Sequence, residues 1–133
     1  MNIVSWNCRG ALNPLFNNSV RDLVHTLSPA VLIITETKVS GTRAKNTTNR
    51  LPFDGAIRAN NIGLIGELWV LWDLGQVEVI ELSSTEQEIH AIIKDLSLGT
   101  SWLLSAIYTS PRYAERKLLW ENISTVARLH SLP

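Results

Sequence analysis

The beginning of the chain shows two strand-like segments with a helical segment between them. Residues 2–6 are of strand length, and residues 30–34 form an uninterrupted apolar run, typical of a strand covered on both faces. Ser19 is the expected N-cap of the helix, and Ser28-Pro29 its expected end. Between them, apolar side chains recur at i, i+3, i+4 and i+7 on one helix face: Val20, Leu23, Val24 and Leu27. The pattern therefore predicts a β-loop-α-β start.

Short strand-like runs dominate the rest of the chain. Residues 41–50 are polar and predict a loop with a turn or two of helix. Apolar runs then follow closely, at about residues 53–58, 67–73, 76–82, 88–94 and 101–108. Such close spacing predicts antiparallel hairpins. Ser110-Pro111 supplies an N-cap and a first-turn proline for a last helix, which carries along one side Leu119, Ile123, Val126 and Leu129.

This order of elements predicts one domain over residues 1–133, of the α/β (α+β) class, with a mostly antiparallel mixed sheet and flanking helices. The composition agrees, because 45% hydrophobic and 18% charged residues are typical of a folded globular chain. The formal net charge is zero, so no global field attracts nucleic acid. The charges are unevenly placed, however. The segment after Glu36 has one acidic residue, Asp54, and these basic residues: Lys38, Arg43, Lys45, Arg50 and Arg58. This stretch suits a phosphate backbone, and the alternative is a solvated loop.

The compartment is indicated by what the sequence lacks. The single cysteine, Cys8, excludes an internal disulfide and fits a reducing environment. No signal peptide or membrane-spanning run is evident. We therefore expect an intracellular protein, nuclear or cytoplasmic and not secreted, with no membrane partner.

Two polar side chains come directly after strand-like runs near the start of the chain. Asn7 follows the first run, and Glu36 follows the second run and Thr35. A carboxylate at a strand end, beside an amide that can orient a phosphate, suits a hard divalent cation such as Mg²⁺. The alternatives are a solvated glutamate and an asparagine that forms an Asx-turn.

Three further side chains are candidates for binding phosphate. Tyr108 ends the last predicted strand, and its phenol can donate to a phosphate oxygen or close the edge of the core. Arg112, near the start of the last helix, and Arg9 can each meet a phosphate or remain surface charges. The tryptophans favour core packing over base stacking, because most lie in strand-like runs. The histidines show no spacing of a metal site or a catalytic dyad.

Three motifs, in this order, resemble the endonuclease/exonuclease/phosphatase superfamily, in the variant of the N-terminal endonuclease region of plant LINE-type (non-LTR) retroelement reverse-transcriptase polyproteins. They are Ser5-Trp6-Asn7-Cys8-Arg9-Gly10, Thr35-Glu36-Thr37-Lys38 and Ser105-Ala106-Ile107-Tyr108-Thr109-Ser110-Pro111-Arg112. The resemblance implies a four-layered α/β sandwich in which Mg²⁺ polarises a phosphodiester for attack by water. It also implies that Glu36 is the metal ligand, Asn7 the first-strand active-site asparagine and Tyr108 the tyrosine at the scissile phosphate.

The sequence departs from the family pattern in three places. Arg9 stands where many relatives have an acidic residue, and Glu67 replaces the second glycine of a Gly-Gly pair. The family's Gly-Asp-x-Asn motif is expected shortly after the position of Pro133, with its Ser-Asp-His motif further on, and neither is in these residues. The resemblance therefore implies the N-terminal half of the sandwich. Because it also implies that the two halves pack sheet against sheet, we expect one apolar sheet face to be uncovered.

The sequence thus favours a truncated Mg-dependent phosphodiesterase or endonuclease domain of retroelement origin. We expect this chain to be inactive alone and to bind Mg²⁺ weakly, with DNA or another phosphodiester as the partner of the complete domain. Two alternatives stay open: a non-catalytic interaction remnant, and a phosphatase of the same superfamily. No residue in the sequence selects the substrate.

Overall fold

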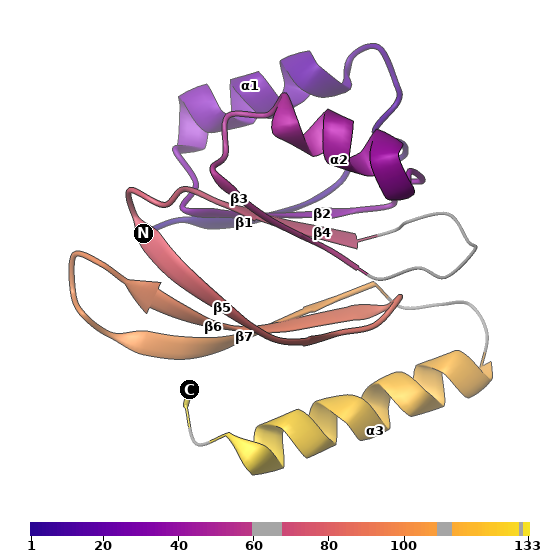
Figure 1. The fold of residues 1–133 in the computed structure, drawn as a ribbon, viewed down its shortest axis with the longest axis vertical. Coiled ribbons are helices and arrows are strands. Elements are labelled where there is room, and N and C mark those ends of the chain that lie inside the picture. Colours follow the sequence, from indigo (N-terminus) through magenta and orange to yellow (C-terminus); the bar gives the residue numbers. More distant parts are fainter. Residues whose placement is uncertain (60–67, 109–112, 131) are drawn as a thin grey trace.

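The computed structural model describes residues 1–59, 68–108, 113–130 and 132–133. These residues form two β-sheets and three helices (Figure 1). The elements, in chain order, are β1 (Ile3–Asn7), α1 (Phe16–Leu27), β2 (Val31–Thr35), α2 (Gly41–Asn49), β3 (Gly55–Arg58), β4 (Leu68–Trp72), β5 (Val77–Ser84), β6 (Glu88–Asp95), β7 (Ser101–Ile107) and α3 (Tyr113–Leu129).

The two sheets differ in how their strands are ordered. Sheet 1 has the order β1-β2-β4-β3, in which β1 and β2 are parallel and the other pairs are antiparallel. Sheet 2 has the order β5-β6-β7 and is antiparallel throughout. The short connections from β5 to β7 explain this, since antiparallel strands can be joined by tight turns. The predicted α+β class with mostly antiparallel pairing is confirmed.

The elements form four layers, in the order α1 and α2, sheet 1, sheet 2, and α3 (Figure 1). One core lies between the sheets and contains Val70 of β4 together with Ile89 and Ile93 of β6. A second core lies between sheet 1 and the first two helices and contains Val20 of α1 and Ile34 of β2. All four layers of the sandwich are therefore present in these residues.

This arrangement corrects the expectation of an uncovered sheet face. We expected the two halves of the domain to pack sheet against sheet, but both sheets belong to this chain, and residues of β2, β3 and β4 pack against residues of β5, β6 and β7. The described strands are instead open at the sheet edges, because β1 and β3 bound sheet 1 while β5 and β7 bound sheet 2. Unpaired backbone groups along an edge strand can pair with a further strand.

The strand predictions are confirmed to within a few residues, but the first helix was predicted too short. Helix α1 begins at Phe16 and contains Ser19, which is not its N-cap. The turn before the helix is fixed by Asn13, whose Oδ1 accepts from Leu15 N at 2.9 Å and whose carbonyl accepts from Phe16 N. Phe16 is buried, with its ring stacked on that of Trp6. Tertiary packing thus extends the helix beyond the apolar repeat.

Two other expectations meet the structure differently. Residues 41–49 form a nine-residue helix, α2, which is longer than the predicted turn or two. Ala44 and Thr48 are the buried residues of this helix. Ser110-Pro111, the predicted start of the last helix, and Glu67 lie outside the described residues. Among the described helices, none has the length and hydropathy that a membrane crossing requires.

Asp95 organises the turn between β6 and β7, and it provides a pH-dependent prediction. Its Oδ1 accepts from the hydroxyl and the backbone N–H of Ser97, at 2.8 and 2.9 Å, and from Leu98 N at 3.3 Å. The hydrogen bond from the Ser97 hydroxyl is the main reason why the pKa of Asp95 lies below its ordinary value of 3.8.

A lowered carboxyl pKa in the folded state contributes stability that is present above the unfolded pKa and is lost as the pH falls through the folded pKa. We therefore expect the free energy of unfolding to fall below pH 3.8, and Asp95→Asn to weaken that dependence. Urea unfolding followed by circular dichroism over this pH range measures both. An Asp95→Asn variant with the same acid dependence as the parent chain would contradict the prediction.

Candidate functional site

The parallel pairing of β1 with β2 brings the two main candidate residues to one end of sheet 1. Asn7 lies directly opposite Thr35 in the register of the two strands, and Glu36 is the next residue after Thr35. The carboxyl ends of parallel strands share a sheet edge, so an amide and a carboxylate meet there. Glu36 is partly buried and Asn7 is exposed.

Backbone hydrogen bonds hold the two segments together beyond the strands. The N–H groups of Cys8, Gly10 and Ala11 donate to the carbonyls of residues 35, 36 and 37, at 3.1, 2.8 and 2.9 Å. The segment after β1 therefore follows the segment after β2 residue by residue. These bonds fix the backbone of Glu36 from one side.

The backbone at this edge is strained. The described residues include four non-glycine residues with positive φ, and three of them, Arg9, Glu36 and Lys38, lie here with φ of 54°, 54° and 55°. Each such residue costs on the order of 1–3 kcal/mol and is kept only where its surroundings over-determine it. Such conformations concentrate at functional sites. One of these three residues is Glu36, the carboxylate predicted from the sequence to bind the metal ion.

Tyr108 reaches this edge from the other sheet. It follows β7, and its backbone N–H donates to the carbonyl of Gln87 at 2.8 Å. Its phenol donates to Glu36 Oε1 at 3.5 Å, a long hydrogen bond between residues that are 72 positions apart. The structure thus brings Asn7, Glu36 and Tyr108 together where the two sheets meet.

The asparagine and the arginines have different outcomes. Asn7 Oδ1 accepts from Arg9 N at 3.1 Å, so the Asx-turn is present. The same geometry leaves the side-chain NH₂ of Asn7 without a partner among the described residues, able to donate to a phosphate oxygen. Arg9 is exposed beside it. Arg112, the other predicted phosphate ligand, lies outside the described residues.

The donor set at this edge fits a hard divalent cation only in part. Glu36 offers a carboxylate and Asn7 an amide oxygen, which are ligand types that Mg²⁺ uses. The described residues contain no group of three or more His, Cys, Asp or Glu side chains that could enclose a metal ion. With one carboxylate, water must fill most of an octahedral shell, so these residues fit weakly held Mg²⁺.

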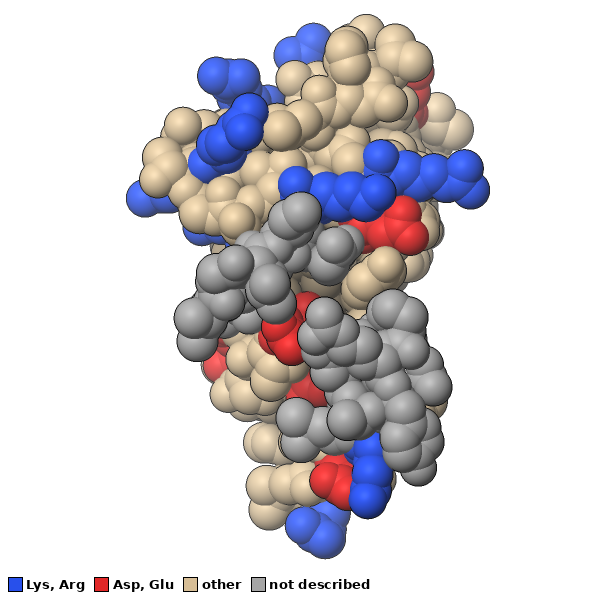
Figure 2. Space-filling model, turned by 90° about the vertical axis from the view of Figure 1, so that its right-hand side faces the viewer, with Lys and Arg blue, Asp and Glu red and all other residues tan. Residues whose placement is uncertain are grey.

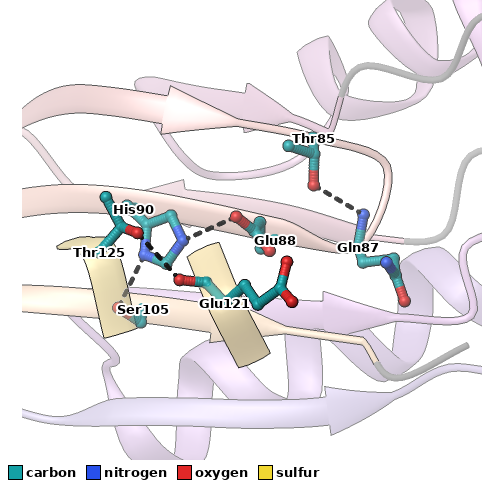
Figure 3. Close-up of polar contacts among 7 residues, drawn as sticks. All are labelled: Thr85, Gln87, Glu88, His90, Ser105, Glu121 and Thr125. Carbon is teal, nitrogen blue, oxygen red and sulfur yellow. Dashed lines mark hydrogen bonds and ion pairs between the residues drawn. The ribbon is translucent and has the colours of Figure 1, made fainter. Parts of the chain in front are cut away.

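A second polar cluster, which the sequence reasoning missed, lies on the outer face of sheet 2. His90 Nε2 is 3.1 Å from Glu88 Oε1, and His90 Nδ1 is 2.8 Å from Ser105 Oγ (Figure 3). His90 and Glu88 are 0% and 2% exposed, and Glu88 Oε2 has no hydrogen-bond partner among the described residues. The signal was Glu-x-His within an apolar strand, since alternate residues of a strand share a face.

Comparisons with known proteins find structural likeness only. No protein-family model matches the sequence, and no curated protein matches it. The endonuclease domain of TRAS1, a telomere-specific non-LTR retrotransposon, matches with a TM-score of 0.65 at 18% identity, over 94% of this chain and 52% of that one. A humanized TDP2 from D. rerio matches with a TM-score of 0.59 at 11% identity, over 97% and 56%.

An AP endonuclease from Leishmania major, LMAP, matches with a TM-score of 0.60 at 16% identity, over 81% of this chain and 40% of that one. All three are members of the endonuclease/exonuclease/phosphatase superfamily. The chain spans about half the length of the structures it matches. The predicted resemblance is therefore confirmed at the level of the fold, and the chain has the fold of about half of an endonuclease/exonuclease/phosphatase domain.

Proposed function

We propose that this chain is part of a metal-dependent phosphodiesterase domain of the endonuclease type, and that it supplies the residues that hold the cation and orient the phosphate. The observation that carries the proposal is the meeting of Glu36 with Tyr108, from different sheets, beside Asn7. Three different chemical groups converge on one strained sheet edge, and each suits a phosphodiester or its metal ion.

The residues would act as follows. Glu36 would hold Mg²⁺ through its carboxylate, and the cation would supply Lewis acidity at this edge. Tyr108 would exchange its long hydrogen bond to Glu36 for a hydrogen bond from its phenol to a phosphate oxygen. Asn7 would donate a hydrogen bond to the phosphate from its side-chain NH₂ group. All three interactions position the phosphate and neutralise its charge, and none of them removes a proton from water.

The retroelement origin is the more specific part of the proposal. It is supported by the three sequence motifs and by the similarity to the TRAS1 domain, whose source is a non-LTR retrotransposon. A DNA substrate is supported by a further match, a D. rerio TDP2 structure complexed with single-strand DNA product, at a TM-score of 0.60 and 12% identity. We propose DNA as the phosphodiester that this edge binds.

Metal binding tests the central residue directly. We expect calorimetric titration with Mg²⁺ to show weak binding that Glu36→Gln weakens at least about tenfold, because the amide removes the charge that attracts the cation. Glu78→Gln is the matched control, since Glu78 is an exposed carboxylate on β5. Tight Mg²⁺ binding, or weak binding that survives Glu36→Gln, would show that the ligand set differs from the one proposed.

A further inference from the structure

Arg58 lies at the same end of sheet 1 as the candidate site. It is the last residue of β3 and pairs with Trp69 of β4, next to the pair that Leu68 forms with Thr35 of β2. Asn7 is opposite Thr35 on β1. Neighbouring strands are about 4.8 Å apart, so Arg58 is about 10 Å from the end of β2, across β4. That separation is about three steps of 3.4 Å along a DNA duplex.

A buried hydroxyl group holds the Arg58 side chain in place. Nη1 of Arg58 donates to Thr48 Oγ1 at 3.0 Å. Thr48 is 4% exposed, and its Oγ1 lies 3.0 Å from the carbonyl oxygens of both Ala44 and Lys45 in α2. Arg58 is itself half-buried, so its guanidinium loses little further side-chain freedom on binding a ligand.

The charge of Arg58 is not neutralised within the described structure. The one ion pair among the described residues joins His90 and Glu88 on the other sheet. A fixed guanidinium with free N–H groups is suited to a phosphate, which it can bind through two parallel hydrogen bonds. Arg58 therefore combines a fixed position, an available charge and a location at the same end of sheet 1 as Glu36, across β4.

The charges of the two sheet layers have opposite signs. Residues 1–59, which form α1, α2 and three strands of sheet 1, contain seven basic and three acidic residues. Residues 68–108, which form β4 and sheet 2, contain one basic and six acidic residues. Figure 2 shows a band of Lys and Arg side chains across the part of the molecule that carries α1, α2 and sheet 1. A polyanion is attracted to that part.

We propose that Arg58, held by Thr48, is a phosphate-binding residue for the DNA backbone beside the scissile position, and that the duplex lies over the sheet 1 layer. This inference rests on the proposed function, because it takes the phosphate at Glu36 as its reference point. It adds a direction: the DNA leaves the site toward β3 and α2, away from the acidic layer of sheet 2.

The test is the salt dependence of DNA binding by the 133-residue chain, measured by fluorescence anisotropy with a short labelled duplex in EDTA. Each neutralised phosphate contributes about 0.9 to the slope of log affinity against log salt. We expect Arg58→Gln to lower that slope by about 0.9, so that its affinity loss is about 3.5-fold larger at about 50 mM than at about 200 mM salt. Lys94→Gln, an equal charge change at an exposed position of β6, is expected to leave the slope unchanged.

Two further variants separate charge from position. Arg58→Lys and Thr48→Val keep the positive charge, so we expect an unchanged slope with lower affinity. They also carry the test if circular dichroism shows that Arg58→Gln does not fold. An unchanged slope in folded Arg58→Gln, an equal slope change in Lys94→Gln, or undiminished affinity in both charge-retaining variants would overturn the inference. Because the assay contains no Mg²⁺, failure of the proposed catalytic role leaves this result intact and is detected separately by titrating Mg²⁺ against Glu36→Gln.

Discussion

In a nicking assay with supercoiled plasmid and Mg²⁺, we expect the 133-residue chain to be no faster than its Glu36→Gln variant. Glu36, Asn7 and Tyr108 can hold a cation and a phosphate, but the described partner of the Glu36 carboxylate is a phenol, which is not a base at neutral pH. His90 is on the outer face of sheet 2, bonded to Glu88 and Ser105. General base catalysis is typically worth about 10²–10⁴-fold, so its absence alone suppresses the reaction.

The matched experiment extends the chain. A version that continues through the Gly-Asp-x-Asn and Ser-Asp-His motifs of the family is expected to nick at least about 10²-fold faster, because those motifs would supply a base and further phosphate contacts. Glu36→Gln in the longer chain should remove the gain. Fast nicking by the 133-residue chain that vanishes in Glu36→Gln would contradict the prediction. It would mean that a residue interpreted here as structural acts as the base.

The first part of the site could be predicted because it depends on local pattern and one topological rule. Two apolar runs joined by a helix predict parallel strands, and parallel strands place Asn7 and Glu36 at one edge. The contact of Tyr108 with Glu36 could not be predicted from periodicity, because it joins two sheets whose packing is set by the whole core. The resemblance implies active-site roles for Tyr108 and Glu36 separately, and their contact is a finding of the structure.

The misses have a common physical cause. Helix α1 begins early because Phe16 packs against Trp6 and Trp69, a contact that local sequence does not encode. The pair of Glu88 and His90 was overlooked because its sequence pattern is the same whether the outer face of the strand is solvated or covered. Only the strand register, which places Ser105 opposite His90, shows that the two side chains form a polar cluster. In each case, tertiary packing decides what the local pattern leaves open.

The buried pair on sheet 2 leads to the largest expected change in stability. We expect His90→Leu to lower the free energy of unfolding by about 3–5 kcal/mol, because removing one partner of a buried pair leaves the other uncompensated. Within the described part of the chain, one carboxylate oxygen of Glu88 already has no partner, and the substitution would remove the partner of the other oxygen. Ser105→Ala should cost only about 1 kcal/mol, since Ser105 is exposed and loses its hydrogen bond to His90.

A double variant separates pairing from packing. Replacing both partners, with Glu88→Met and His90→Leu together, removes the polar groups along with their need for each other. Such replacements by apolar residues of similar volume are often neutral or stabilising. We therefore expect the double variant to be more stable than His90→Leu alone and close to the parent chain. Urea unfolding of the parent chain, His90→Leu, Ser105→Ala and the double variant measures these stabilities. A double variant at least as unstable as His90→Leu would show that Glu88 and His90 contribute through packing rather than through their mutual bond.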